Sequence, residues 1–146
     1  MNPAESLEES PFVDYLSIEV IRAEPGYGKA VMELDDCHAG PPGGGIAHGG
    51  AISAFADTVA GAAKLPLAGS VTPTVDLRID YLRSADGETL HGTAETRREG
   101  RDVITVDIEM TDENDREIAT GRGVFKTGNH DDQSDWDERW KRDSGE

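Results

Sequence analysis

Residues 49–64 read GGAISAFADTVAGAAK, and small or apolar side chains cover nearly all of this segment. The larger apolar side chains recur at spacings of three and four, the periodicity of one helix face. They are Ile52, Phe55, Val59 and Ala63. The opposite face carries Ala and Gly, and a helix that is apolar all round is a buried helix. The segment therefore predicts one central helix, ended by Leu65-Pro66 and Gly69.

Strand-like segments lie on both sides of this helix. Two precede it and four follow it, at residues 13–24, 29–34, 71–83, 89–98, 103–110 and 117–126. The last four are expected to run as a meander. An antiparallel sheet can cover one helix on a single side, so the expected fold class is α+β, with an antiparallel sheet around one long helix. A single chain would leave much of this sheet exposed, which favours self-association.

The ends of the chain differ from its middle. Residues 1–12 are polar and acidic and are expected to be loose, residues 13–127 form one domain, and residues 128–146 form an acidic tail. Cys37 is the single cysteine, so no disulfide can form within the chain. No secretory signal or membrane-spanning stretch is present in the sequence, and a cytoplasmic protein is expected.

The charge is strongly negative. Thirty acidic residues face fourteen basic ones, for a formal net charge of -16. Such a chain repels nucleic acid and anionic membranes, so neither is expected as a partner. An acid-rich, lysine-poor composition is typical of proteins adapted to high salt, where screening reduces self-repulsion. An ordinary acidic protein with an acidic tail is the alternative.

Asp57 is the main candidate for chemistry. It lies in the middle of the apolar helix, and its neighbours three and four residues away cannot neutralise a carboxylate. A buried carboxylate needs either a partner from elsewhere or a proton. Such a group is a good general base or nucleophile, although a half-exposed structural Asp would look the same in sequence.

A glycine-rich segment, GGGIAHGG, leads into the helix at residues 43–50. Its last amides lie at the helix N-terminus, where unpaired N–H groups could form an oxyanion hole or bind a phosphate. It matches neither the phosphate-loop nor the dinucleotide pattern. His48 is a candidate base or, more simply, a structural residue that bonds the backbone. The pair Cys37-His38 lacks the spacing of a zinc set, so no metal is expected.

Together these residues resemble a known family. His48-Gly49-Gly50 followed by Asp57 resembles the signature of the hotdog-fold acyl-CoA thioesterases of the phenylacetate-pathway type, which also matches Gly45. The similarity extends over residues 16–127 and implies a hotdog fold that acts as a homodimer or tetramer. It implies hydrolysis of an acyl-CoA, with no cofactor other than the CoA of the substrate.

The resemblance also implies roles for individual residues. The Gly49 amide would polarise the thioester carbonyl, and Asp57 from the other subunit would activate water or attack the carbonyl itself. Thr74 matches a hydroxyl that helps to orient the water. Gly45, His48 and Gly50 would line the substrate site. Basic residues near the mouth would bind the nucleotide phosphates, and the candidates are Arg83, Arg98, Arg101 and Arg122.

The sequence departs from the family pattern at Pro42, which stands where the family has Asn. Proline has no amide side chain to hold a leaving group or a water molecule. Two alternatives to a thioesterase therefore stay open. One is a hotdog protein that binds an acyl-CoA without turning it over, which Pro42 favours and Asp57 opposes. The other is a hotdog dehydratase or hydratase, which His48 beside Gly49 fits less well.

Overall fold

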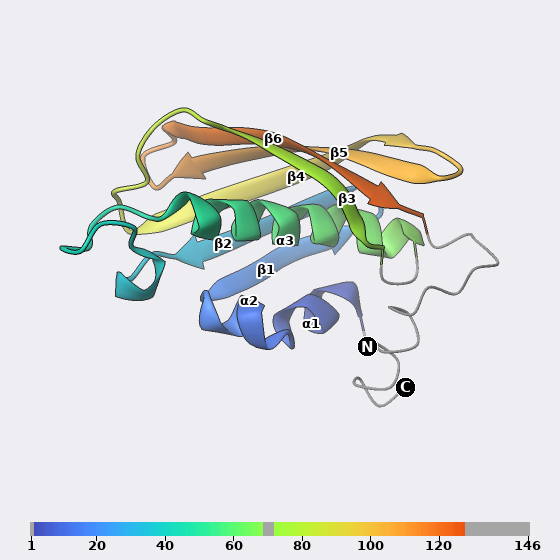
Figure 1. The fold of residues 1–146 in the computed structure, drawn as a ribbon. Coiled ribbons are helices and arrows are strands. Elements are labelled where there is room, and N and C mark those ends of the chain that lie inside the picture. Colours follow the sequence, from blue (N-terminus) through green and yellow to red (C-terminus); the bar gives the residue numbers. More distant parts are fainter. Residues whose placement is uncertain (1, 69–71, 128–146) are drawn as a thin grey trace.

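The computed structural model describes residues 2–68 and 72–127 of the 146-residue chain (Figure 1). The helices are α1 (Pro3–Glu8), α2 (Pro11–Tyr15) and α3 (Gly49–Ala68), with a short 3-10 helix, η1 (Asp36–His38). The strands are β1 (Ile18–Glu24), β2 (Tyr27–Glu33), β3 (Thr74–Tyr81), β4 (Thr89–Glu99), β5 (Val103–Asp112) and β6 (Glu117–Lys126). No helix in the described ranges is long and apolar enough to cross a membrane.

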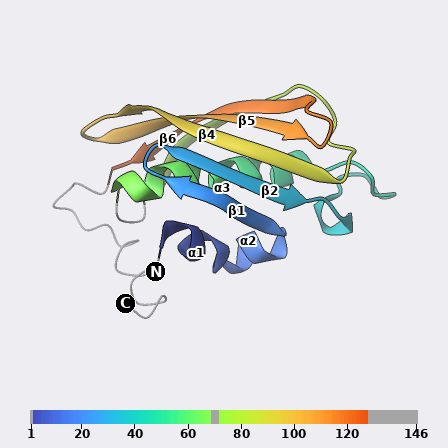
Figure 2. The same cartoon turned by 180° about the vertical axis from the view of Figure 1, so that it is seen from behind.

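The strands form one antiparallel sheet in the order β1-β2-β4-β5-β6-β3. The long helix α3 lies along one face of this sheet, which curves around it (Figure 1). Seen from behind, α1 and α2 lie beside β1, at the edge opposite β3 (Figure 2). The predicted fold class is confirmed: this is the hotdog arrangement of an antiparallel sheet around one long helix.

Glycines on β2 and β4 let α3 lie close against the sheet. A Cβ at Gly28 would lie 2.7 Å from the Val59 carbonyl oxygen, and one at Gly92 would lie 2.7 Å from Val59 Cγ2. Phe55 and Val59, both on the predicted apolar stripe, are fully buried against these strands. These two glycines let the helix approach the sheet closely at Val59, and this contact fixes the position of α3.

The expectation of a loose segment at residues 1–12 is wrong, as is a strand beginning at Val13. Asn2 caps α1 through a capping box with Glu5, and Leu7 of α1 packs on α3, where a Cβ at Gly61 would lie 3.2 Å from Leu7 Cδ2. The chain then forms α2, and β1 starts only at Ile18, after Ser17 with a φ of 57°.

The expected four-strand meander is also only partly correct. β4, β5 and β6 are consecutive neighbours, but β3 pairs with β6 at the edge of the sheet and not with β4. The connection from β3 to β4 crosses the N-terminal end of α3, where the Ala85 carbonyl accepts a hydrogen bond from the Ala47 N–H at 2.9 Å. Because of this crossing, β3 lies beside β6 at the edge of the sheet.

The central helix ends at Ala68, directly before Gly69, which was one of its two predicted end signals. It continues two residues past Pro66, so the Leu65-Pro66 pair does not end it. Proline removes one helical hydrogen bond, and at this position the interruption lies in the last turn, where the helix ends anyway. The predicted acidic tail at residues 128–146 lies outside the described residues.

Candidate active site

The first turn of α3 is capped by the histidine that precedes it. His48 Nδ1 accepts a hydrogen bond from the Gly50 N–H at 2.8 Å, and the His48 carbonyl accepts from the Ala51 and Ile52 N–H groups. The Gly49 N–H makes no hydrogen bond within residues 2–68 and 72–127. Gly49 therefore offers the one amide of this first turn that is available to a ligand oxygen within the described chain.

Tyr81 holds this turn in place from the end of β3. Its hydroxyl donates to the Gly49 carbonyl at 3.1 Å and shares a hydrogen bond with Ser53 Oγ at 2.5 Å. The ring lies against Gly49, where an added Cβ would be 3.4 Å from Tyr81 Cε1. Tyr81 was predicted only as a strand residue, and its contact with the helix depends on where β3 lies.

Asp57 lies two turns farther along the helix and is half-buried. Its Oδ1 accepts a hydrogen bond from Thr74 Oγ1, the first residue of β3, at 2.9 Å. The sequence left two possibilities for this carboxylate, a partner from elsewhere in the fold or a proton. The structure provides a partner, the Thr74 hydroxyl. The structure thus brings together the two side chains to which the family resemblance assigned the chemistry.

Within one chain, Gly49 and Asp57 cannot act on the same carbonyl. They are eight residues apart on one helix, which separates them by about 12 Å along its axis. A reacting carbonyl must lie about 3 Å from both the oxyanion donor and the base or nucleophile. Gly49 and Asp57 therefore lie at two separate positions along the helix of each chain.

The comparisons with known proteins identify the family of this chain. The family description "Thioesterase superfamily" matches residues 44–119, which include the first turn of α3, Asp57 and Thr74. The chain belongs to the thioesterase superfamily. Its relatives include the medium/long-chain acyl-CoA thioesterase YigI of Escherichia coli K12, which is 27% identical over 136 residues, 81% of this chain and 86% of YigI.

A putative esterase of Halobacterium salinarum is 34% identical to this thioesterase-superfamily chain over 96 residues, 58% of this chain and 62% of the relative. Among solved structures, the E. coli PaaI protein of the phenylacetic acid degradation operon superposes with a TM-score of 0.73 at 25% identity, covering 85% of this chain and 94% of PaaI. Zebrafish thioesterase superfamily member 2 gives 0.74 at 28% identity, covering 85% and 92%.

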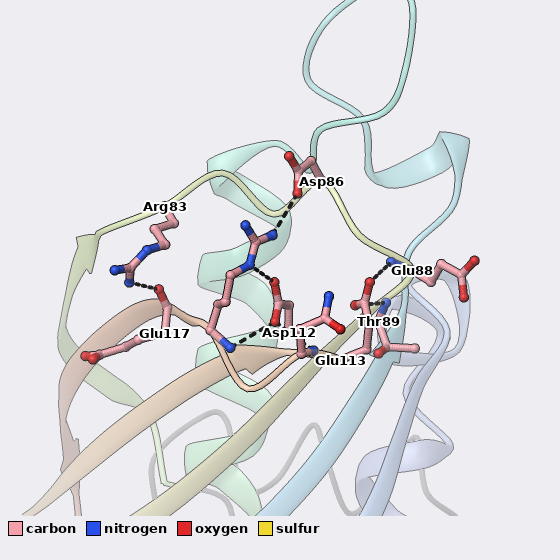
Figure 3. Close-up of polar contacts among 9 residues, drawn as sticks. Arg83, Asp86, Glu88, Thr89, Asp112, Glu113 and Glu117 are labelled. Carbon is pink, nitrogen blue, oxygen red and sulfur yellow. Dashed lines mark hydrogen bonds and ion pairs between the residues drawn. The ribbon is translucent and has the colours of Figure 1, made fainter.

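The four arginines proposed for phosphate binding do not gather in one place in this superfamily member. Arg83 lies near the start of β6, where its Nη1 donates to the Glu117 carbonyl at 2.8 Å (Figure 3). Arg98 and Arg101 flank the β4–β5 turn at the other end of the sheet. Arg122 donates to Asp107 Oδ1 at 2.8 Å. Only Arg83 lies near the first turn of α3 in the same chain.

Arg122 also points away from the helix. Its partner Asp107 alternates on β5 with the buried residues Val106 and Ile108, whose side chains face α3. Asp107 and Arg122 therefore occupy the opposite face of the sheet. The Asp107 side chain raises the pKa of Arg122 through a hydrogen bond and its charge, so this guanidinium is already engaged by a carboxylate.

A polar network holds the crossing loop beside the helix N-terminus (Figure 3). The Asp112 side chain, 1% exposed, accepts from Arg116 Nε at 2.8 Å, and Arg116 Nη2 reaches Asp86 Oδ1 at 3.3 Å. Desolvation works to raise the pKa of Asp112, but hydrogen bonds from Arg116 and Asn114 outweigh it and lower that pKa. The network thereby fixes the connection from β3 to β4, whose Ala85 carbonyl accepts a hydrogen bond from Ala47, the residue before His48.

The glycine-rich loop forms one wall of a pocket. Gly45 and Ile46 line it on one side, and Ala85 and Asp86 on the other. Asp35 and Asp36 also line it, so its negative charge opposes the phosphates of a nucleotide. Pro42 is exposed on the same loop, and Gly44 and Gly45 adopt positive φ values of 76° and 86°.

The sequence prediction missed a buried cation near Asp57. Lys64, on the same helix, is 7% exposed, and its Nζ donates to the Thr72 carbonyl at 2.8 Å. The ammonium also lies 3.6 Å from the centre of the Phe125 ring. Desolvation lowers the pKa of Lys64 to about 8, and the charge of Asp57 acts in the opposite direction. The lysine was visible in the sequence, but nothing there distinguished it from an exposed residue in the last turn.

Proposed function

We propose that this chain hydrolyses the thioester of an acyl-CoA to a free acid and CoA. The observation that carries the proposal is the half-buried Asp57 carboxylate, held by the Thr74 hydroxyl at 2.9 Å. It lies on a helix whose first residue, Gly49, has an N–H that is unpaired within the described residues. Membership of the thioesterase superfamily and the acyl-CoA thioesterase named among the relatives support the same activity.

The proposed chemistry uses both halves of the site. The Gly49 N–H donates to the thioester oxygen and stabilises the negative charge that develops on it. Asp57 either removes a proton from an attacking water molecule or adds to the carbonyl carbon itself, after which water releases the acid. In both routes the C–S bond breaks and the departing thiolate of CoA takes up a proton. Thr74 fixes one carboxylate oxygen and leaves the other for the water or the carbonyl.

We propose that the two halves meet across a homodimer. The separation of about 12 Å within one helix means that Gly49 and Asp57 must come from different chains to act together. β3 is an edge strand beside this site, and it exposes apolar side chains there and just beyond it: Val75 (55%), Tyr81 (53%) and Leu82 (50%). An open edge strand with apolar side chains is a surface for pairing with another chain.

Thiol release from a panel of short, medium, long and aromatic acyl-CoAs, in high salt, tests the activity. YigI carries medium/long-chain specificity in its name, so hydrolysis is expected first in those classes. Asp57→Asn should lower kcat by about 100-fold or more with an unchanged circular dichroism spectrum. Asp14→Asn, which removes the same charge from exposed α2, is the matched control and should retain activity.

The alternative is a protein that binds an acyl-CoA without turning it over. It is favoured by one observation, the exposed Pro42 where the family has Asn. Saturable binding of acyl-CoA with no thiol release from any member of the panel would select this alternative. Restoration of turnover by Pro42→Asn would then show that the proline is the cause.

A further inference from the structure

Lys64 is a buried lysine that the proposed reaction does not use. It follows Asp57 by seven residues, so both side chains lie on the same side of α3, two turns apart. Its 7% exposure is rare for a lysine, which is almost never buried this far without a partner. Its direct partners are the Thr72 carbonyl, at 2.8 Å from Nζ, and the Phe125 ring, at 3.6 Å.

Packing alone gives no reason for a charge at this position. An apolar residue of similar volume would fill the space beside Phe125 without the loss of hydration, and such replacements of buried charges are often neutral or stabilising. The burial of Lys64 is severe enough to lower its pKa to about 8. The ammonium supplies a charge and hydrogen-bond donors that a methionine at this position would lack.

Lys64 and Asp57 bond residues that are close neighbours in the chain at the start of β3. Thr72 stands two residues before Thr74, whose hydroxyl holds Asp57 Oδ1. Between them, the Pro73 carbonyl accepts from the Lys126 N–H at 3.0 Å. The start of β3 is therefore bonded to α3 twice. Lys64 bonds it at Thr72, and Asp57 bonds it at Thr74.

The charges of the two residues are also coupled. Asp57 is the only charged group of the described residues that acts on the pKa of Lys64, and it favours the ammonium. The Asp57 carboxylate thus offsets part of the desolvation of the buried ammonium.

We propose that Lys64 is a positioning residue of the active site, which tethers the start of β3 so that Thr74 reaches Asp57. The inference rests on the proposed function for its catalytic consequence. The tether itself is independent of turnover.

Steady-state kinetics test the catalytic part. Lys64→Met is expected to lower kcat about tenfold with KM little changed, because the start of β3 is released and Thr74 no longer holds Asp57. Lys126→Met removes the same charge from an exposed position on β6 and should follow the wild type. Lys64→Arg, which keeps the charge and the donors, should retain most of the wild-type kcat. Equal kcat values in Lys64→Met and Lys126→Met would overturn the proposal.

A second measurement separates this inference from the proposed function. The methyl signal of Thr74, assigned by its absence in Thr74→Ala, can be compared by NMR in the wild type, Lys64→Met and Lys126→Met. The signal is expected to move in Lys64→Met only, and an unmoved signal overturns the tether. Absence of hydrolysis by the wild type would refute the proposed function alone and leave this result standing.

Discussion

Burial of Lys64 makes the stability of the fold depend on pH in a specific direction. In the folded chain its pKa is lowered from 10.5 to about 8 by desolvation. Between these two values the unfolded chain binds more protons than the folded chain, so the free energy of unfolding rises with pH there. Below pH 8 the folded state carries the full penalty, about 3 kcal/mol at 1.4 kcal/mol per pKa unit. Above pH 10.5 the penalty is gone.

Urea unfolding at pH 7 and pH 9.5 measures this penalty, with Lys64→Met as the comparison. Other groups titrate in both proteins, so the informative quantity is the difference between their pH dependences. The wild type should gain about 2 kcal/mol over Lys64→Met across this interval, since the remaining relief of about 1 kcal/mol comes above pH 9.5. Lys126→Met should retain the wild-type dependence. Equal pH dependences in wild type and Lys64→Met would show that the ammonium is not desolvated and refute the reasoning.

Three further predictions follow from single contacts. Thr74→Ala should lower kcat about tenfold, less than Asp57→Asn, because the threonine only holds the carboxylate; an equal loss in a thiol-release assay would contradict these roles. Gly92→Ala should destabilise the fold by about 1–3 kcal/mol in urea unfolding, since its Cβ would lie 2.7 Å from a helix side chain, whereas Gly43→Ala, with no atom within 4 Å, should be neutral. Tyr81→Phe should lower kcat about threefold with KM little changed, because the hydroxyl fixes the turn that carries the oxyanion donor; a change in KM alone would assign it to binding instead.

The sequence predicted local elements better than their partners. The buried helix and most strands follow from apolar periodicity, and β6 has the predicted bounds, Glu117–Lys126. The pairing of β3 with β6 could not be read from periodicity, because it depends on a connection across the end of α3. The N-terminal helices were missed although α1 has a capping box from Asn2 to Glu5 and both helices begin with proline. They are short, and the packing of Leu7 on α3 is not visible in the sequence.

Prediction of the candidate site had the same limit: the sequence pointed to a single residue, but not to the residues that it contacts. Asp57 was conspicuous because a carboxylate in an apolar helix conflicts with its surroundings. Its partner Thr74 came only from family resemblance, since the 2.9 Å contact joins residues seventeen positions apart through the position of β3. Lys64 gave no signal, because a cation in the last turns of a helix is favourable on the surface as well. Only the fold shows that this one is covered by Phe125.

The two halves of the site give a direct test of the shared dimer. Gly49 is the first residue of α3, the helical position at which proline is tolerated, so Gly49→Pro removes the proposed oxyanion donor with little effect on the helix. Gly49→Pro and Asp57→Asn should each be inactive alone. In a hybrid dimer one site contains both substitutions and the other contains neither.

Co-refolding the two variants in equal amounts should therefore recover about a quarter of the wild-type activity, because half of the dimers are hybrid and each has one intact site of two. A site contained within one chain predicts no recovery, since every chain carries one lesion. Chains mixed without unfolding are the control for slow exchange. Failure to recover activity, with hybrid dimers demonstrated by mass, would rule out the shared site and require another group near Asp57 to stabilise the oxyanion.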